Sequence, residues 1–521
     1  MTTAHDATGR RPRARTIGTE TEFGIVAVDD PDASPVHTST QAVVAYARTS
    51  GQGVNRRTRW DYTDESPLRD VRGYDLRRYR TAPVLDPNAP GVANVVTTSG
   101  ARFYVDHAHP EYSSPEVTDA RQAVVWDKAG ELLMHEAARA SGGVDGQPHL
   151  KIYKNNVDGK GASYGAHENY LHPRDYSPDD LQAALVPHFV TRQVYTGAGR
   201  VGLGETARDP GFQISQRADY IETTVSLETT LNRGIVNTRD EPHADERWRR
   251  LHVIIGDANL SETATYLKVG TTALLLDAVG AGVDLSDLAL YDPVADVRRV
   301  SRDLTCREEL RLYGNGRMSA VEIQREIRRR IADAVDRGDI AADDTDRDVL
   351  RVWGEVLDDL AADPARTADR LDWTAKLSLL EGYRRRGLDW DHPTLALVDI
   401  QYHDIDPAKG LYNALVAKGR MRTLVDPGEV RAAVTQPPST TRAWLRGTVV
   451  DRFAPDLLAA SWDALILDTP FGSHPATHVA MPEPCGSTAA ELAALCADGP
   501  DVATFVRRLA EAAPDRVSGI G

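Results

Sequence analysis

The sequence of 521 residues has very little cysteine and no long apolar run. Its three cysteines, Cys306, Cys485 and Cys496, form no CxxC pair, which argues against a disulfide framework and against a zinc site built from thiolates. No run approaches the roughly 18 apolar residues that a membrane span requires, and even residues 273–279 are interrupted by Asp277. We therefore expect a protein of the reducing cytoplasm that is not embedded in a membrane.

Positive charge is also scarce, since 61 Lys and Arg residues face 77 Asp and Glu residues and the formal net charge is −16. A surplus of that size disfavours nonspecific binding to nucleic acid or to an anionic membrane surface. The basic N-terminus is followed by no apolar stretch, so it is not a secretory signal. We expect residues 1–14 to form a disordered tail, because chain ends are commonly unordered.

Three familiar motifs fail on their context or spacing. Residues 197–202 fit GxGxxG, but a poor helix-forming segment follows where a dinucleotide-binding fold needs a helix. His167 and His172 are five residues apart rather than four, so they cannot both face one zinc ion from a helix. No GxxxxGK[ST] loop is present. The sequence thus argues against a Rossmann site, a P-loop and a zinc protease of the HExxH class.

Alternating polar and apolar residues predict strands at 15–28, 101–108, 150–155, 167–172 and 249–255. Apolar periodicity and end signals predict helices at 118–139, around 323–335 and at 348–361. The charged stretch 51–93 lacks periodicity and is interpreted as a long insertion loop, either functional or an ordinary spacer. A turn at residues 436–438 divides a main domain, 15–435, from a small C-terminal domain, 436–521.

Polar side chains recur on strands whose other face is apolar. A set rich in carboxylates, with one or two imidazoles, suits Mg²⁺ or Mn²⁺. Such a cation can bridge the phosphates of a nucleotide while arginines neutralise the remaining charge. For a single residue such as His252 a purely structural role stays open, because buried polar groups need partners in any case. The members are Glu20, Glu22, Tyr104, Asp106, Glu111, His167, Asn169, Arg250 and His252.

Five stretches carry a resemblance to a known family: GTETEFG at 18–24, GARFYVDHAHPEY at 100–112, YKNNVDGKG at 153–161, HENY at 167–170 and NTRDEPHAD at 237–245. Together they resemble the Pup ligase/Pup deamidase family from about residue 15 to residue 462. Two features favour the deamidase branch. The ligases lack the insertion at 51–93, and they typically have Val-Gly-Ser-His-Pro-Glu where this chain has His107-Ala-His-Pro-Glu111. Beyond about residue 468 the resemblance is poor.

The resemblance implies an α/β (α+β) fold of the glutamine-synthetase-like, carboxylate–amine-ligase type. A curved, mainly antiparallel sheet would be flanked by helices, with a small C-terminal domain beside it. The implied activity is an ATP- and Mg²⁺-dependent amidohydrolase that converts the C-terminal Gln of Pup to Glu and cleaves the isopeptide between Pup and substrate lysines. Pup and pupylated proteins would be the partners, with a functional link to the bacterial proteasome. A Pup–protein ligase and a non-catalytic regulator that binds Pup or nucleotide remain alternatives.

The resemblance also implies roles for individual residues. Asp106 would be the catalytic carboxylate, which shares a strand face with Arg102 and Tyr104 and either forms a covalent anhydride or activates water. Arg217 would grip the acidic C-terminal end of Pup, and Trp462 would lie at the nucleotide base. Magnesium would be held by Glu20, Tyr104, Glu111, His167 and His252. The other ATP contacts would be Gly18, Thr19, Glu20, Thr21, Glu22, Arg102, Ser113, Ser114, Asn169 and Arg250.

Overall fold

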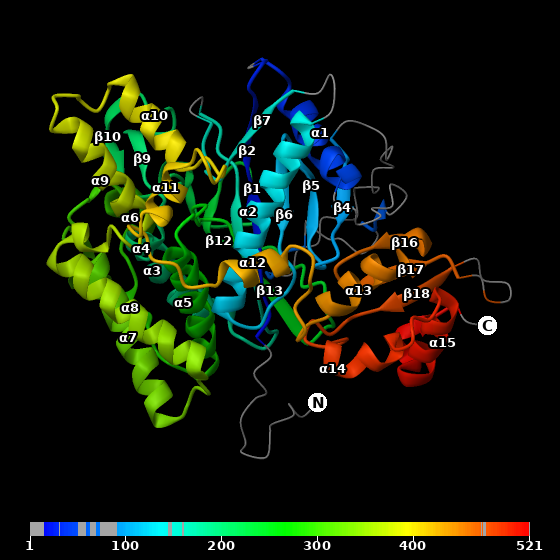
Figure 1. The fold of residues 1–521 in the computed structure, drawn as a ribbon. Helices are drawn as coiled ribbons and strands as arrows, with labels where there is room; N and C mark the ends of the chain where they lie inside the picture. Colours follow the sequence, from blue (N-terminus) through cyan, green and yellow to red (C-terminus); the bar gives the residue numbers. More distant parts are fainter. Residues whose placement is uncertain are drawn as a thin grey trace.

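The computed structural model describes residues 15–519 except 31, 50–58, 63–68, 73–90, 144–147, 159–160, 470 and 472–475. The expected tail at 1–14 and most of the expected insertion loop lie outside these residues. A central sheet lies between a layer of helices and a smaller C-terminal sheet (Figure 1). No helix in the described ranges is both long and apolar enough to cross a membrane.

The central sheet has six strands in the order β13-β8-β1-β6-β5-β4, and every neighbouring pair is antiparallel. This arrangement confirms the expected mainly antiparallel sheet. The strands are β1 (Ile17–Glu22), β4 (Asn94–Val96), β5 (Arg102–Asp106), β6 (His109–Ser113), β8 (Ala166–Pro173) and β13 (Trp248–Val253).

Two helices, α1 (Pro35–Thr49) and α2 (Ala120–Gly142), pack against one face of this sheet. The strand residues Phe103 and Tyr112 are buried there, and the rings of Phe103 and Tyr46 of α1 meet edge to face at 5.7 Å. Helix α2 begins after Asp119, whose side chain accepts a hydrogen bond from the amide of Gln122. The polar functional groups are therefore left on the opposite face.

The first predicted strand, 15–28, is in fact two strands, and the prediction of one strand was wrong. After β1 the chain leaves the central sheet at Phe23, and β2 (Gly24–Ala27) pairs instead with β7 (Leu150–Tyr153). The amide of Phe23 donates to the carbonyl of Pro110, which ends the β1 ladder. Alternation along the sequence does not reveal such a change of partner, because both strands keep the same period.

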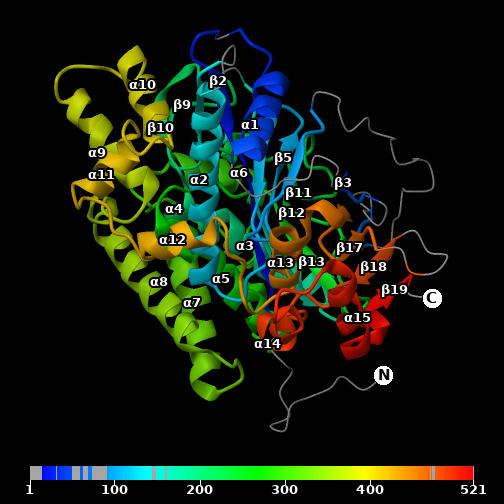
Figure 2. The ribbon, with the colours of Figure 1, turned by 45° about the vertical axis from the view of Figure 1, so that its right-hand side comes forward.

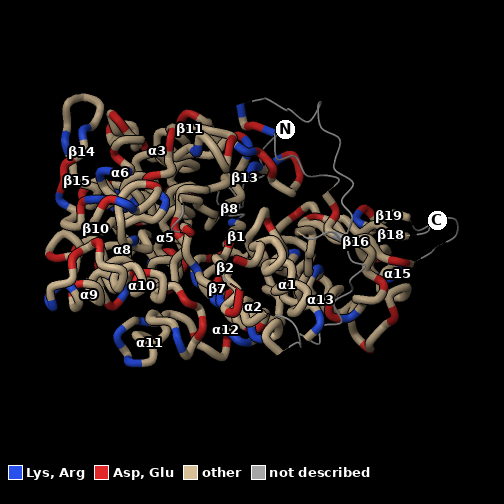
Figure 3. The backbone as a smooth tube through the Cα atoms, turned by 90° about the horizontal axis from the view of Figure 1, so that it is seen from above, with Lys and Arg blue, Asp and Glu red and all other residues tan. Residues whose placement is uncertain are grey.

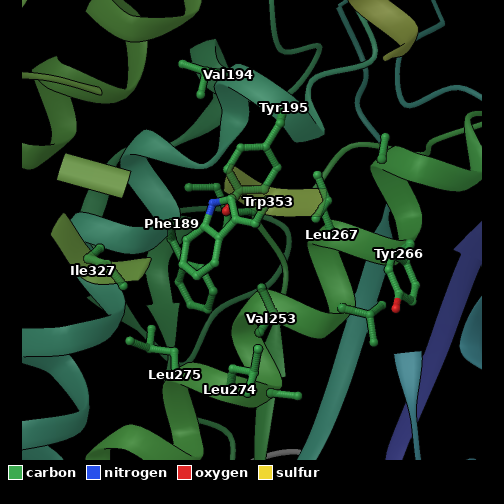
Figure 4. Packing of buried hydrophobic residues seen from close by; sticks show 14 of the residues in the cluster. Phe189, Val194, Tyr195, Val253, Tyr266, Leu267, Leu274, Leu275, Ile327 and Trp353 are labelled. Atoms are coloured by element: carbon green, nitrogen blue, oxygen red, sulfur yellow. The ribbon is translucent and has the colours of Figure 1, made fainter. Parts of the chain in front are cut away.

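The helical layer contains α3 (Pro178–Thr191), α5 (Glu262–Gly280), α7 (Ala320–Arg337) and α8 (Asp344–Ala362). Trp353 of α8 is fully buried among residues that include Phe189, Tyr195 and Ile327 (Figure 4). The apolar positions predicted at four-residue intervals in α7 are all buried, and a capping box at Ser319 starts that helix.

Lys and Arg are interspersed with Asp and Glu over the backbone (Figure 3).

A buried ion pair connects the central sheet to this helical layer. Glu168, on the helix-facing side of β8, makes two hydrogen bonds with the guanidinium of Arg192, at 2.5 and 2.9 Å. We expect Glu168→Ala to lower the free energy of unfolding by about 3–5 kcal/mol, because the charge of Arg192 is then buried without its counter-ion. The exposed pair Arg325–Asp358 supplies the control: Asp358→Ala should cost about 1 kcal/mol or less. Urea unfolding measures both variants, and an equal loss of unfolding free energy in the two would contradict the stabilising role of the buried pair.

A second sheet forms near the C-terminus in the order β19-β18-β17-β16-β3. It packs with α13 (Ala443–Phe453) and α15 (Val502–Ala512) around a separate apolar cluster. Its edge strand β3 (Arg59–Trp60; labelled in Figure 2) comes from the stretch 51–93. It pairs parallel to β16. The stretch expected as a long insertion loop thus contains a short strand at these two residues. The other strands are β16 (Leu457–Ala460), β17 (Ala464–Leu467), β18 (Thr477–Ala480) and β19 (Val517–Ser518).

The remaining regular elements connect these layers. They are α4 (Gln193–Thr196), β9 (Arg200–Leu203), β10 (Asp209–Gln213), β11 (Thr223–Ser226), β12 (Gly234–Asn237), α6 (Pro293–Arg302), β14 (Glu309–Arg311), β15 (Arg317–Ser319), α9 (Asp372–Arg384), α10 (Pro393–Tyr402), α11 (Leu411–Ala417), α12 (Pro427–Ala433) and α14 (Ala489–Leu492).

Candidate active site

The register of the central sheet gathers the polar residues on one face. Glu20 of β1 lies opposite Ser113 of β6 and opposite His167 of β8. Glu111 of β6 lies opposite Glu22 on one side and opposite Tyr104 on the other. Residues directly opposite one another in a sheet share a face, so this pairing aligns side chains from four strands.

The first cluster consists of Glu20, His167 and His252, whose potential ligand atoms all lie within 4.8 Å of one another. Asn169 donates from its amide nitrogen to Glu20 at 2.8 Å, so its carbonyl oxygen is left to accept from Nδ1 of His252 at 2.9 Å. This leaves Nε2 of His252 with its lone pair free. A histidine oriented through its other nitrogen in this way is the usual arrangement in metal sites.

Electrostatics keep the members of this first cluster in forms that can bind a cation. Burial alone would raise the pKa of Glu20, but the hydrogen bond from His167 and the positive charge of Arg250 outweigh it and lower that pKa. Burial, together with the positive charge of Arg250, holds the pKa of His252 well below its ordinary value. The cluster therefore offers an ionised carboxylate and a neutral imidazole at neutral pH.

The second cluster consists of Glu22, Asp106 and Glu111, whose carboxylate oxygens also lie within 4.8 Å of one another. Glu22 is held by His109 at 3.0 Å and by the amide of Gly165 at 2.8 Å. A side chain at Gly165 would meet the His167 ring at 2.3 Å, so only glycine permits this close approach. The sequence had suggested Glu22 as an ATP contact and had not singled out His109.

Like charge accumulates in the second cluster. Burial and the neighbouring carboxylates Asp106, Glu20 and Glu22 raise the pKa of Glu111 well above its ordinary value. Burial and the charge of Glu111 likewise raise the pKa of the Tyr104 phenol. Three carboxylates so close together repel one another unless a cation lies between them. Their oxygen donors fit a hard divalent cation such as Mg²⁺.

Asp106 is the most accessible member of the second cluster, with 38% of its side chain exposed. It ends β5 and pairs at 3.0 Å with His107, which has a left-handed backbone (φ 52°) in the following turn. The hydrogen bond with Asp106 and the charge of that carboxylate raise the pKa of His107 to about 9. Asp106 is thus a partly exposed carboxylate beside a protonated imidazole and the acidic cluster.

A pocket of about 520 Å³ of empty space begins at Glu20 and continues along β1 and β8. Thr21, Glu22 and Arg102 do not line it. The side chain of Thr21 alternates to the helix-covered face, where Tyr112 lies opposite. The predicted nucleotide residues that do line the pocket are Gly18, Thr19, Glu20, Ser113, Ser114, Asn169, Arg250 and Trp462.

Arg102 lies instead in an aromatic stack. Its guanidinium carbon is 4.1 Å from the ring centre of Trp60 and 3.8 Å from that of Tyr104. Trp60 in turn meets Trp462 edge to face at 5.1 Å, and Tyr62 accepts a hydrogen bond from Arg102 at 2.8 Å. Residues 59–62 of the insertion are therefore part of the site. The sequence alone did not indicate residues 59–62, because their role depends on contacts with Arg102 and Trp462, which are distant from them along the chain.

A buried ion cluster closes the far end of the pocket. Glu116 accepts hydrogen bonds from Arg442 and Arg446 of the C-terminal part of the chain, and Arg446 also donates to the carbonyl of Trp462. Burial acts to raise the pKa of Glu116, but the two arginines outweigh it and lower that pKa to about 2. The cluster thereby fixes the wall that carries Trp462.

The ionisation of Glu116 should make the free energy of unfolding depend on pH. Its pKa rises from about 2 in the folded chain to the ordinary 4.5 on unfolding, so its stabilisation is complete above pH 4.5 and is lost as the pH falls toward 2. We expect Glu116→Gln to cost about 3 kcal/mol at pH 7 and progressively less in acid. Urea unfolding between pH 7 and pH 3 measures this. The control variant is Glu429→Gln, which changes an exposed carboxylate paired with Arg121. If both variants lost stability with the same dependence on pH, the role given to Glu116 would be contradicted.

A wide groove adjoins the acidic cluster at His109 and contains about 2230 Å³ of empty space. Arg217 is fully buried near this groove and donates to Ser163 at 3.2 Å and to the carbonyl of Tyr164. Burial and the positive charge of Arg233 lower the pKa of Arg217 to about 10, so the guanidinium stays charged at neutral pH. Its Nε is buried without a hydrogen-bond partner in the described chain.

Comparisons with known proteins agree with this geometry. A family model described as Pup-ligase protein matches residues 15–466. A Pup deamidase/depupylase of Mycolicibacterium smegmatis is 54% identical over 484 residues, which cover 92% of this chain and 96% of that relative. The crystal structure of the complex between the prokaryotic ubiquitin-like protein Pup and its ligase PafA is similar at a TM-score of 0.74, with 29% identity over 91% of this chain and 90% of that one. The structure of the Pup ligase PafA in complex with ADP is similar at a TM-score of 0.69. Its sequence identity is 31%, and the match covers 81% of this chain and 90% of that one.

Proposed function

Because the chain belongs to the Pup-ligase protein family, we propose that it is a Pup deamidase and depupylase. It would hydrolyse the C-terminal glutamine amide of Pup to glutamate, and the isopeptide bond between that glutamate and a substrate lysine. The observation that carries the proposal is the position of Asp106. Its carboxylate is partly exposed, lies at the edge of the acidic cluster and is next to the groove of about 2230 Å³ that Ala108 and His109 line.

Asp106 supplies the reacting group in this proposal. Its carboxylate oxygen either attacks the carbonyl carbon of the amide or takes a proton from a water molecule that does so. The C–N bond then breaks and the nitrogen leaves, protonated, as ammonia or as the lysine amine; in the first case water afterwards hydrolyses the resulting anhydride to two carboxylic acids. His107, protonated at neutral pH, pairs with Asp106 and keeps that carboxylate oriented in the turn after β5. Glu22 is fixed by His109 and Gly165, so the acidic cluster is organised before substrate arrives.

Magnesium fits the two carboxylate clusters by the chemistry of their donors. Glu20, His167 and His252 would hold one ion, and Glu22 and Glu111 would hold another beside Asp106. When bound, Mg²⁺ supplies charge that stabilises a developing oxyanion and neutralises nucleotide phosphates. Tyr104, expected from the sequence to be a ligand, lies directly opposite Glu111 and would border the second ion.

ATP would occupy the pocket along β1. Its phosphates would lie near Glu20 and the cation, and its base would lie near Trp462. Ser114 already accepts a hydrogen bond from the amide of Thr19, which fixes the backbone of this wall. The similarity to ADP-bound PafA supports nucleotide binding here. As in the sequence prediction, ATP would serve as a cofactor of hydrolysis and not as its fuel.

The C-terminal part of Pup would reach Asp106 through the groove. Arg217, with an unsatisfied buried Nε, and the neighbouring Arg233 would bind the carboxylate groups at that end of Pup. The similarity to the Pup-bound ligase supports such a partner. We also propose that the protein acts in the cytoplasm, in functional connection with the bacterial proteasome.

Two parallel incubations distinguish a depupylase from a Pup–protein ligase and from a non-catalytic regulator. The protein is mixed with Mg²⁺, ATP and a purified Pup conjugate, and in parallel with Pup ending in glutamate and a lysine acceptor. A depupylase releases free acceptor from the conjugate. New conjugate formed from the free components, without release from the old one, would instead identify a ligase. No change in either mixture would identify a binding protein without catalysis.

A further inference from the structure

His243 is half-buried in the wall of the nucleotide pocket and has no role in the proposed reaction. It lies in the loop before β13, and lines the pocket together with Pro242, Arg442 and Trp462. In the described chain neither nitrogen of its imidazole makes a hydrogen bond. The residue belongs to the stretch 237–245, whose sequence resembles the family but to which sequence analysis gave no function.

The backbone of His243 is held in an unusual conformation. Its φ of 47° lies in the left-handed region, which residues with a side chain rarely adopt. The conformation is fixed from outside, because the carbonyl of His243 accepts a hydrogen bond from Arg442 at 2.6 Å and Arg442 is held by Glu116. Strained residues that the surroundings fix in this way are concentrated at ligand sites.

The charge state of His243 suits an uncharged ligand group. Burial and the nearby positive charge of Arg250 lower its pKa to about 4, so the imidazole is neutral at pH 7. A neutral imidazole has one nitrogen that donates and one that accepts. It therefore complements hydroxyl groups or the edge of a base better than a phosphate.

His243 lies at the end of the pocket away from the cation clusters. Its hydrogen-bond partner Arg442 also donates to Glu116 and, from its amide, to the carbonyl of Pro484. Thr16 lies at the same end, because its hydroxyl contacts the sulfur of the next residue, Cys485, at 3.3 Å. Thr16 precedes Glu20 by four residues on an extended strand, which corresponds to about 13 Å. If the phosphates lie at Glu20, the sugar and base of the nucleotide lie near His243.

We infer that the imidazole of His243 binds the nucleoside part of the nucleotide, at the ribose hydroxyls or the base. The inference rests on the proposed function, since it presumes a nucleotide in this pocket. His243 is then a binding residue for the cofactor that makes no contact with the reacting amide. Loss of its side chain should weaken nucleotide binding and leave the chemical step unchanged.

The test is His243→Gly in the full-length protein, assayed for conjugate cleavage at varied ATP concentration. Glycine adopts a positive φ freely, so this variant removes the imidazole without adding backbone strain. We expect KM for ATP to rise about threefold to tenfold, the effect of one lost hydrogen bond, at unchanged kcat. The melting temperature without nucleotide should not fall. His243→Asn, which tolerates the same backbone conformation and keeps a polar group, should show a smaller rise.

His172→Ala is the matched control. His172 is also buried, burial also lowers its pKa to about 4, and it lies on the helix-covered side of β8 outside the pocket. This control should change stability but not KM for ATP. An unchanged KM in His243→Gly would overturn the inference, and so would a fall in kcat by the same factor. A wild-type protein that cleaves without any nucleotide would instead contradict the proposed function.

Discussion

Replacing Asp106 by asparagine should abolish cleavage of Pup conjugates while leaving ATP binding nearly intact. The substitution keeps the shape of the side chain but removes the charge that makes it a nucleophile or a base. We expect kcat to fall at least about 10³-fold. The dissociation constant for ATP should change little, because Asp106 does not line the nucleotide pocket.

The measurement is single-turnover cleavage of a purified conjugate, combined with calorimetric titration of ATP. Asp358→Asn, which changes an exposed carboxylate on α8, serves as a control and should behave as the wild type. Cleavage that persists in Asp106→Asn would show that another group reacts. Parallel loss of ATP binding would show that Asp106 holds the nucleotide instead.

Replacing Glu111 by glutamine should change stability and activity in opposite directions. Glu111 is buried beside three other carboxylates that raise its pKa, so without a cation its charge is unfavourable. The neutral amide should stabilise the metal-free protein by about 1 kcal/mol or more. Activity should fall at least about 100-fold, because a ligand of the proposed cation site is lost.

Thermal unfolding in the presence of a chelator and of Mg²⁺ reports both effects. The wild type should be stabilised by Mg²⁺, whereas Glu111→Gln should start at a higher melting temperature and respond less. Glu136 on α2 is a matched control, since burial raises its pKa away from the site. Glu136→Gln should retain the full response to Mg²⁺. A full response in Glu111→Gln would contradict its place in the cation site.

The strands that carry the site could be predicted because each keeps one apolar and one polar face. Period-two alternation located β1, β5, β8 and β13, and it placed Glu20 and Glu22 on one side. The short strand β3 could not be predicted, because its two residues are extended only through their pairing with β16. Helix α1 was also missed.

The separation of the site into two clusters depends on register, which sequence spacing does not encode. Pairing of β1 with β6 sets Glu22 beside Glu111 and Asp106, and pairing with β8 sets Glu20 beside His167. The predicted metal ligands are therefore distributed over both clusters. Thr21, predicted from the resemblance to contact ATP, alternates to the other face.

The motifs rejected at the level of sequence have simple structural explanations. The second half of residues 197–202 is itself part of the strand β9 and no helix follows the motif, so a dinucleotide phosphate would find no helix N-terminus there. His167 and His172 lie on the strand β8, where an odd spacing places them on opposite faces. Only His167 reaches the site.

The central claim is tested most directly by mass spectrometry of Pup ending in glutamine, incubated with this protein, Mg²⁺ and ATP. We predict a gain of about one mass unit at the C-terminus, from amide to acid, that requires both Asp106 and the nucleotide. Pup of unchanged mass, together with a Pup conjugate that also stays intact, would contradict the assignment of this site to amide hydrolysis.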